Sequence, residues 1–302
     1  MPRQARLDAP GTLHHVILRG IEKRYIVDTL DDRRDFVSRM GELAVGTQTI
    51  IYAWVLMTNH AHMLLRSGPQ GLSSYMRRLL TGYAVTYNRR HSRRGHLFQN
   101  RYKSIVCEED AYFMELVRYI HLNPIRSGMV KNMSELARFP WCGHRAIIGK
   151  MEYEWQDCDY VLRWFGKREN EAKKAYRRYV QEGISMGKRP ELVGGGLIRS
   201  QGGWSQVLSM RGHGDRELSD ERILGSGDFV ERIISEADKK IKYQFPEKER
   251  KNRVQKYILD MCRRNGINIK EVRAGSRRRG VTEIRSHVAR ALVGNYGIPL
   301  QR

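Results

Sequence analysis

Cysteine is scarce in this sequence, and the cysteines that occur lie far apart. There are four, at positions 107, 142, 158 and 262, and no two of them form a C-x-x-C pair. This spacing argues against a zinc site and against a disulfide framework. Residues 1–10 contain no apolar stretch of signal-peptide length, so the reducing cytosol is the expected location.

Long apolar runs and acidic residues are also few. No run approaches the roughly 18 apolar residues of a membrane span, and we therefore expect no membrane partner. The chain has 33 Asp and Glu against 55 Lys and Arg, so its formal net charge is +22. Because a basic surface displaces counterions from phosphates, nucleic acid is the first partner to consider. A ribosome-like or membrane-surface protein carries similar charge and is the alternative interpretation.

The order of apolar and polar residues predicts an α+β fold for the first half of the chain. Period-two and β-branched runs indicate strands, and apolar residues at helical spacing indicate helices. The last helix is expected to end at Asn123, because the residue before Pro124 is pushed out of the helical region. The order of elements resembles a split β-α-β pattern, an antiparallel sheet with helices on one face. The expected strands are 13–19, 49–57, 60–66 and 101–106, and the expected helices are 31–45, 72–90 and 109–123.

The chain has 302 residues, enough for two domains, and its composition suggests where they divide. Residues 1–148 hold the α+β pattern and an irregular closing segment. Residues 149–220 are expected to form helical connectors followed by a linker rich in Gly, Ser and Arg. Residues 221–302 return to helical patterns, with expected helices over 223–241, 247–264 and 281–293.

Two histidines on the strand 60–66 suggest a metal site. His60 and His62 are separated by one residue, so the period of a strand points both imidazoles to the same face. Two adjacent imidazoles form half of a divalent-metal site. Two histidines on a strand face are also often plain polar surface, so this pair needs support from elsewhere in the chain.

The helix 109–123 supplies that support. Tyr119 and Asn123 are four residues apart and share one helix face. The amide oxygen of Asn123 suits a hard cation such as Mg²⁺ or Mn²⁺, and Tyr119 offers a phenol. Tyr119 could instead be a core aromatic, and Tyr112, two turns earlier, is its main rival. We prefer Tyr119 because it lies one turn from Asn123 and hence nearest the predicted metal.

Two imidazoles, an amide oxygen and a phenol suit the cleavage of a phosphodiester. The metal can polarise the phosphate and stabilise charge on the leaving 3′ oxygen. The tyrosine oxygen can attack in line and form a covalent 5′-phosphotyrosine link. The 3′-hydroxyl of another strand can then reverse the step, which joins DNA. The free phenol has a pKa near 10, and the metal or cationic surroundings are the candidates that help it ionise.

Three strings in the chain resemble the REP-associated tyrosine transposases, relatives of the insertion-sequence HUH transposases. They are MTNHAHMLL (57–65), GHLFQNRYKSIV (95–106) and YFMELVRYIHLNPIRSGMV (112–130), and the resemblance covers roughly residues 1–145. It implies a ferredoxin-like fold, DNA transposition and recombination, and substrates that are single-stranded DNA and palindromic hairpins. It also implies that His60 and His62 are metal ligands, that Tyr119 is the nucleophile and that Asn123 completes the metal site.

A basic stretch next to these motifs predicts a path for DNA. Its arginines and lysine can neutralise phosphates, and exposed aromatics among them could stack unpaired bases. The alternatives are that Tyr83 and Tyr87 belong to the core and that the arginines only solvate a helix. The predicted DNA-binding residues of this half are Arg19, Arg77, Arg78, Arg89, Arg90, Arg93, Arg94, Arg101 and Lys103.

The C-terminal segment resembles the DNA-binding domain of the replication initiator DnaA, a helix-turn-helix relative. The resemblance covers perhaps 70 residues and includes the basic run Arg277, Arg278 and Arg279. A helix-turn-helix needs a second helix that enters the major groove. Because the sequence stops at Arg302, this helix is expected to be missing or truncated. A plain helical scaffold is the competing interpretation.

Three functions fit these observations. The first is a metal-dependent DNA strand transferase and nicking endonuclease, and it is favoured because all four site residues are present. The second is a hairpin DNA-binding protein that does not cut. An RNA-binding or ribosome-associated protein is a third reading. We expect a cytoplasmic, nucleoid-associated protein, and the sequence leaves monomer and homodimer, the target sequence and the preferred metal open.

Overall fold

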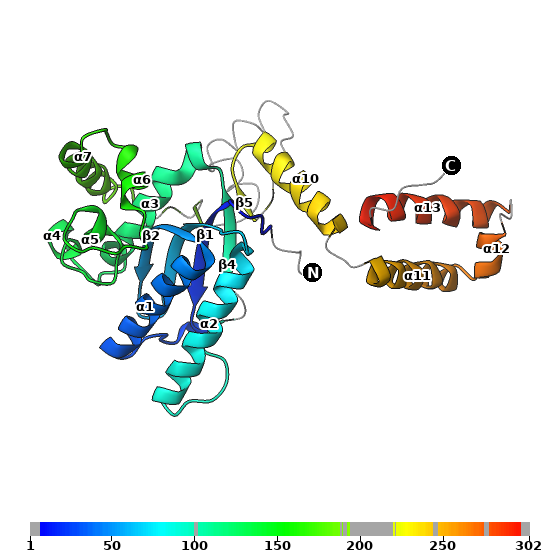
Figure 1. Ribbon diagram of the computed structural model, residues 1–302, viewed down its shortest axis with the longest axis horizontal. Coiled ribbons are helices and arrows are strands. Elements are labelled where there is room, and N and C mark those ends of the chain that lie inside the picture. Colours follow the sequence, from blue (N-terminus) through cyan, green and yellow to red (C-terminus); the bar gives the residue numbers. More distant parts are fainter. Residues whose placement is uncertain are drawn as a thin grey trace. The chain divides into compact units, whose positions relative to one another are not determined.

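The structure is a computed structural model, and it divides the chain into two compact units, one up to Arg232 and one from Ile233 (Figure 1). Each unit is described by itself. The described residues are 7–99, 102–187, 189, 192, 193, 220, 222–243, 247–274 and 278–296.

A five-stranded sheet forms the centre of the first unit. Its strand order is β2-β3-β1-β4-β5, and all neighbours are antiparallel except β4 and β5, which are parallel. With the two helices between its strands, the first four strands follow a β-α-β-β-α-β order, so the predicted α+β fold is confirmed. The strands are β1 (Leu13–Arg19), β2 (Ile50–Leu56), β3 (His60–Arg66), β4 (Lys103–Cys107) and β5 (Ile223–Leu224).

Two long helices cover one face of this sheet. They are α1 (Leu30–Thr47) and α2 (Gly71–Arg90), which lie side by side in Figure 1. Alternate residues of the strands, such as Val16 on β1 and Met63 on β3, point into the core beneath them. The period of two that predicted the strands therefore also decides which side chains meet these helices.

The other face of the sheet is covered by α3 (Glu109–Arg126), which packs against β2 and β3. The prediction had placed the helices on one face. The structure differs from this prediction, because α3 lies on the opposite face from α1 and α2. Its apolar residues, including Leu116 and Ile120, belong to a second core on that face. Residues expected to be connectors extend this layer, and Tyr176 of α7 is fully buried in it. The other helices of the layer are α4 (Met133–Leu136), α5 (His144–Ile147), α6 (Cys158–Arg163) and α7 (Glu169–Glu182).

The helix α3 continues past the position where it was predicted to end. It runs to Arg126 with Pro124 inside it. Proline has no N–H, so the carbonyl of Ile120 loses its usual donor four residues later. The side-chain amide of Asn123 donates to that carbonyl at 3.4 Å and to the Tyr119 carbonyl at 2.9 Å. The Asn123 side chain thus gives the Ile120 carbonyl a donor in place of the missing proline N–H.

Helices make up the described part of the second unit, as predicted. The helix α10 (Gly227–Tyr243) leads from the first unit, and α11 (Glu247–Arg264), α12 (Ile269–Arg273) and α13 (Arg279–Tyr296) contact one another. Cys262 and Val281 are buried among the described side chains. The sequence had not predicted α12, and it had placed residues 223 and 224 in a helix rather than in β5. Among the described residues, no helix is both long and apolar enough to span a membrane.

Candidate active site

The predicted histidine pair lies on the face of the sheet that α3 covers. His60 and His62 point to this face together because they alternate with Ala61, which is buried under α1 and α2. Their ring centroids are 5.3 Å apart, and His62 is 5% exposed. In the register of β1 and β3, Arg19 stands opposite His60. The pair is therefore a largely buried group with one arginine at its open end.

The helix α3 brings the Tyr119 ring to the same place. The centroid of this ring lies 5.8 Å from that of His62, in an edge-to-face arrangement. The predicted site requires that a helix after the fourth strand bring its tyrosine next to the histidines of β3. Tyr112 lies seven residues earlier, about 10 Å along the helix axis. The position of Tyr119 beside the histidines favours it over Tyr112.

A third histidine that the sequence reasoning missed completes the cluster. His15 of β1 is fully buried, and its Nε2 lies 3.0 Å from Nδ1 of His62. The Tyr119 ring centroid lies 5.9 Å from that of His15. The only signal in the sequence was a histidine inside a strand. Its meeting with His62 depends on the pairing of β1 with β3, which the spacing along the chain does not reveal.

Burial keeps both predicted metal ligands neutral near pH 7. It lowers the pKa of His60 to about 4, with a smaller contribution from the charge of Arg19. Burial likewise holds the pKa of His62 well below its ordinary value, and the neighbouring His15, His60 and Arg19 add to this. Neutral imidazoles are the form that binds metal ions. The donor chemistry of the pair therefore fits a divalent cation.

Asn123 is bound to its own helix through the nitrogen of its side chain. The two hydrogen bonds to the Tyr119 and Ile120 carbonyls use Nδ2 and leave the oxygen Oδ1 for another partner. These bonds give Asn123 a structural role that its sequence position did not suggest. Its role as a metal ligand stays a prediction.

A cation lies over the ring of Tyr119. The guanidinium carbon of Arg126 is 5.3 Å from the ring centroid. Its Nε and Nη1 are buried and have no hydrogen-bond partner within the described part of the chain. Burial lowers the pKa of Arg126, and the nearby phenol partly opposes that shift. A buried donor without a partner costs roughly 1–3 kcal/mol.

Comparisons with known proteins bear on the segment that holds this cluster. Residues 11–123 match the family model described as Transposase IS200 like. This segment, called the IS200-like segment below, contains His15, His60, His62, Tyr119 and Asn123. One solved structure, "Structure of the REP associates tyrosine transposase bound to a REP hairpin", is similar at 17% identity with a TM-score of 0.43. The match covers 51% of this chain and 91% of that one. No curated protein matches the chain.

The predicted DNA-binding residues of the IS200-like segment fall into two groups. Arg77 and Arg78 are exposed on α2, on the opposite face of the sheet from Tyr119. The other group consists of Arg19, which stands opposite His60, and of arginines in the loop after α2. In that loop the amide of Gln99 donates to the Arg19 carbonyl at 2.8 Å. This group contains Arg19, Arg93 and Arg94, and Arg89 and Arg90 precede it at the end of α2.

The remaining predicted DNA contacts have varied surroundings. Lys103 of β4 is exposed, and its Nζ donates to the Val193 carbonyl at 2.8 Å. Arg278 is exposed and forms an ion pair with Glu271 at 3.0 Å. Arg101, Arg277 and the side chain of Arg279 lie outside the described residues.

The aromatic residues of α2 belong to the core. Tyr83 is fully buried, and its hydroxyl donates to the Ile26 carbonyl at 2.5 Å. Tyr87 is 4% exposed and donates to Asp28. Neither ring is available to stack on a base, so the core interpretation of these two residues is correct.

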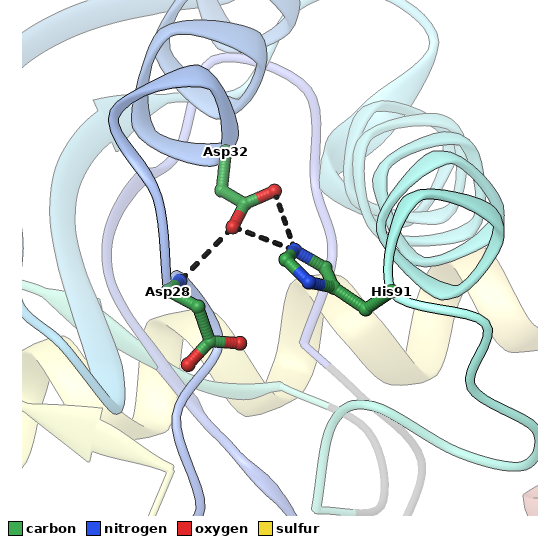
Figure 2. Close-up of side chains that lie close together, drawn as sticks. All are labelled: Asp28, Asp32 and His91. Atoms are coloured by element: carbon green, nitrogen blue, oxygen red, sulfur yellow. Dashed lines mark hydrogen bonds and ion pairs between the residues drawn. The ribbon is translucent and has the colours of Figure 1, made fainter.

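One group of acidic and histidine side chains lies apart from the Tyr119 cluster. Figure 2 shows Asp28, Asp32 and His91, whose ligand atoms lie within 4.8 Å of one another. The carboxylate of Asp32 accepts hydrogen bonds from Arg90, from His91 and from the backbone at the start of α1. These contacts join the start of α1 to the end of α2. They already satisfy Asp32, so the group is best explained as a structural junction.

Proposed function

We propose that the first unit cuts and rejoins single-stranded, hairpin-associated DNA through a covalent 5′-phosphotyrosine intermediate on Tyr119. The observation that carries this proposal is the edge-to-face packing of Tyr119 on His62, with centroids 5.8 Å apart and His60 adjacent. The match of residues 11–123 to an IS200-like transposase model supports the same class of reaction. The reaction makes the protein a DNA strand transferase and nicking endonuclease.

The proposed step is an exchange of one phosphoester for another. The phenol oxygen of Tyr119 forms a bond to phosphorus, and the bond between phosphorus and the 3′ oxygen breaks. The phenol gives up a proton and the leaving oxygen takes one, so a free 3′-hydroxyl results. Because the phosphoester energy is kept in the tyrosine link, a second 3′-hydroxyl can reverse the step and join two strands.

Arg126 supports this step by its place over the Tyr119 ring. A guanidinium 5.3 Å from the ring centroid favours the ionised phenol electrostatically. Its two buried nitrogens without partners are also suited to a phosphate oxygen, which would satisfy both. The cationic surroundings that the phenol needs are thus supplied by the same helix, two turns after the tyrosine.

The metal site of the proposal consists of His60, His62 and the amide oxygen of Asn123. Mg²⁺ or Mn²⁺ bound there would act as a Lewis acid on the phosphate. The two imidazoles are neutral and share one face of β3, which fits this role. Three protein ligands leave coordination positions for the DNA phosphate and water.

A denaturing gel tests the proposal directly. The full chain is mixed with a 3′-labelled DNA hairpin that has single-stranded flanks, with Mn²⁺ or with excess chelator. We expect a covalent protein–DNA band with Mn²⁺, its loss with chelator and its loss in Tyr119→Phe. Tyr112→Phe is the matched control, because it removes a hydroxyl from the same helix two turns earlier and should retain the band.

The other outcomes separate the competing functions. A band that persists in Tyr119→Phe and disappears in Tyr112→Phe would transfer the nucleophile to Tyr112. Hairpin binding without a band under any divalent metal would instead support a DNA-binding protein that does not cut. Preference for RNA over hairpin DNA, without metal dependence, would support the RNA-binding alternative.

A further inference from the structure

The hydrogen bonds around the histidine pair fix which nitrogen each ring can offer to a cation. A neutral imidazole has one N–H donor and one acceptor nitrogen, and the partner of one nitrogen decides the character of the other. His62 and His60 each use Nδ1 for a contact within the protein. The partners of these two Nδ1 atoms therefore determine whether Nε2 carries a lone pair.

The partner of His62 is the buried His15, which is itself fixed by a carbonyl. Nδ1 of His15 lies 3.2 Å from the carbonyl oxygen of Leu192, and this residue is 1% exposed. A carbonyl only accepts, so Nδ1 of His15 carries a proton. In the neutral form of His15 this is the single ring proton, and Nε2 is then an acceptor. Nδ1 of His62, 3.0 Å away, must then be the donor, which leaves the lone pair of His62 on Nε2.

His60 reaches the same state through a different partner. Its Nδ1 lies 2.7 Å from Oδ1 of Asn59. The orientation of that amide is set by a second bond, in which Nδ2 of Asn59 donates to the Lys23 carbonyl at 3.1 Å. The oxygen of Asn59 thus faces His60 and accepts from its Nδ1. Both predicted ligands consequently hold their lone pair on Nε2.

We propose that His15 is a positioning residue that holds His62 in the tautomer with a proton on Nδ1 and a free Nε2 lone pair. Two hydrogen bonds, together called the relay below, connect the Leu192 carbonyl to His15 and His15 to His62. The purpose of the relay rests on the proposed function, because the relay leaves the Nε2 lone pair of His62 available to bind the cation. Partners that fix ligand histidines in this way typically change metal affinity by roughly 10–100-fold when they are removed.

Histidine ring NMR tests the relay without metal or DNA. In the ¹⁵N-labelled wild-type chain we expect the His62 ring to show a protonated Nδ1 and an unprotonated Nε2. His15→Phe should convert His62 to a mixture of tautomers, whereas His15→Gln should retain the wild-type pattern. Glutamine keeps an oxygen that can accept from His62 and a nitrogen that can donate to Leu192. A wild-type His62 protonated on Nε2 would overturn the proposal.

Mn²⁺ titration of the DNA-free chain gives a second readout. We expect His15→Phe to weaken Mn²⁺ binding roughly 10–100-fold and His15→Gln to restore most of it. His14→Phe is the matched control: His14 is equally buried on the same strand but lies on the opposite face, towards α1 and α2. Equal Mn²⁺ affinity in wild type and folded His15→Phe would contradict the proposal.

The two proposals fail in different ways. A chain that binds Mn²⁺ through His60 and His62 but forms no covalent DNA band would refute the nicking reaction and leave the relay intact. A chain that forms the band while His62 is protonated on Nε2 would refute the relay alone. If His15→Phe does not fold, the wild-type tautomer and the His15→Gln variant still decide the question.

Discussion

At the scale of single residues, a substitution of Arg126 tests the proposed mechanism most directly. Its guanidinium lies over the Tyr119 ring and has two buried nitrogens without partners. We expect Arg126→Gln to slow the appearance of the covalent band about 100-fold, in the range found when one preorganised donor is removed from a reaction centre. The rate is measured with saturating hairpin DNA and Mn²⁺, so that weaker binding does not enter it.

Arg138→Gln provides the control for the loss of one positive charge. Arg138 is exposed after α4 and should leave the rate unchanged. A rate for folded Arg126→Gln within twofold of wild type would show that the arginine only supports the helix, through its 3.4 Å bond to the Gly183 carbonyl.

The residues of the site differ in how far the sequence could reveal them. His60 and His62 could be found because alternation within one strand is visible in the sequence. Tyr119 could be chosen because it lies one helical turn from Asn123. His15 could not, because its contact with His62 joins residues that are 47 positions apart. Arg126 was missed because α3 was expected to end before it.

At the scale of elements, a buried hydroxyl joins three helices of the layer that supports α3. The hydroxyl of Tyr176 on α7 lies 2.8 Å from Nδ1 of His121 on α3 and 2.7 Å from Nδ1 of His144 on α5. All three side chains are almost wholly buried. We expect Tyr176→Phe to lower the free energy of unfolding by about 2–3 kcal/mol, because two buried polar nitrogens lose their partner. Urea unfolding at pH 7 measures this change.

Tyr179→Phe is the comparison for Tyr176→Phe. Tyr179 is half-buried on the same helix, and its hydroxyl makes a 2.9 Å bond to Glu115. Its loss should cost no more than about 1 kcal/mol, because water can reach the partner that remains. Equal losses in the two variants would mean that the hydroxyl of Tyr176 does not join the helices.

The elements themselves were largely predictable, and the exceptions have physical causes. The strands β1 and β3 begin and end at the predicted residues, and side chains of both strands are buried on both faces of the sheet. The two-residue strand β5 gives too short a pattern to detect, and only its pairing with β4 defines it. The extra turn of α3 is accompanied by a local bond from the Asn123 amide to the Ile120 carbonyl, which the rule for residues before proline does not include.

At the scale of the whole molecule, the net charge of +22 does not say where DNA would bind, and the places of the arginines in the fold lead to a prediction. Arg19 stands opposite His60 in the sheet, and the loop that carries Arg94 is bound to the end of β1. Arg77 and Arg78 lie on α2, on the opposite face of the sheet from Tyr119. They lie about 18 Å from the end of α2, as judged from the helical rise of the residues between.

The salt dependence of hairpin binding can separate these two groups. Each phosphate contact to a single strand contributes about 0.7 to the slope of log affinity against log salt. We therefore expect Arg19→Gln and Arg94→Gln each to reduce the slope by about that amount, and Arg77→Gln and Arg78→Gln to leave it unchanged. Fluorescence anisotropy with a labelled hairpin, in the inactive Tyr119→Phe background, provides the measurement. Equal reductions in all four variants would mean that DNA contacts both groups of arginines, and the prediction would then be wrong.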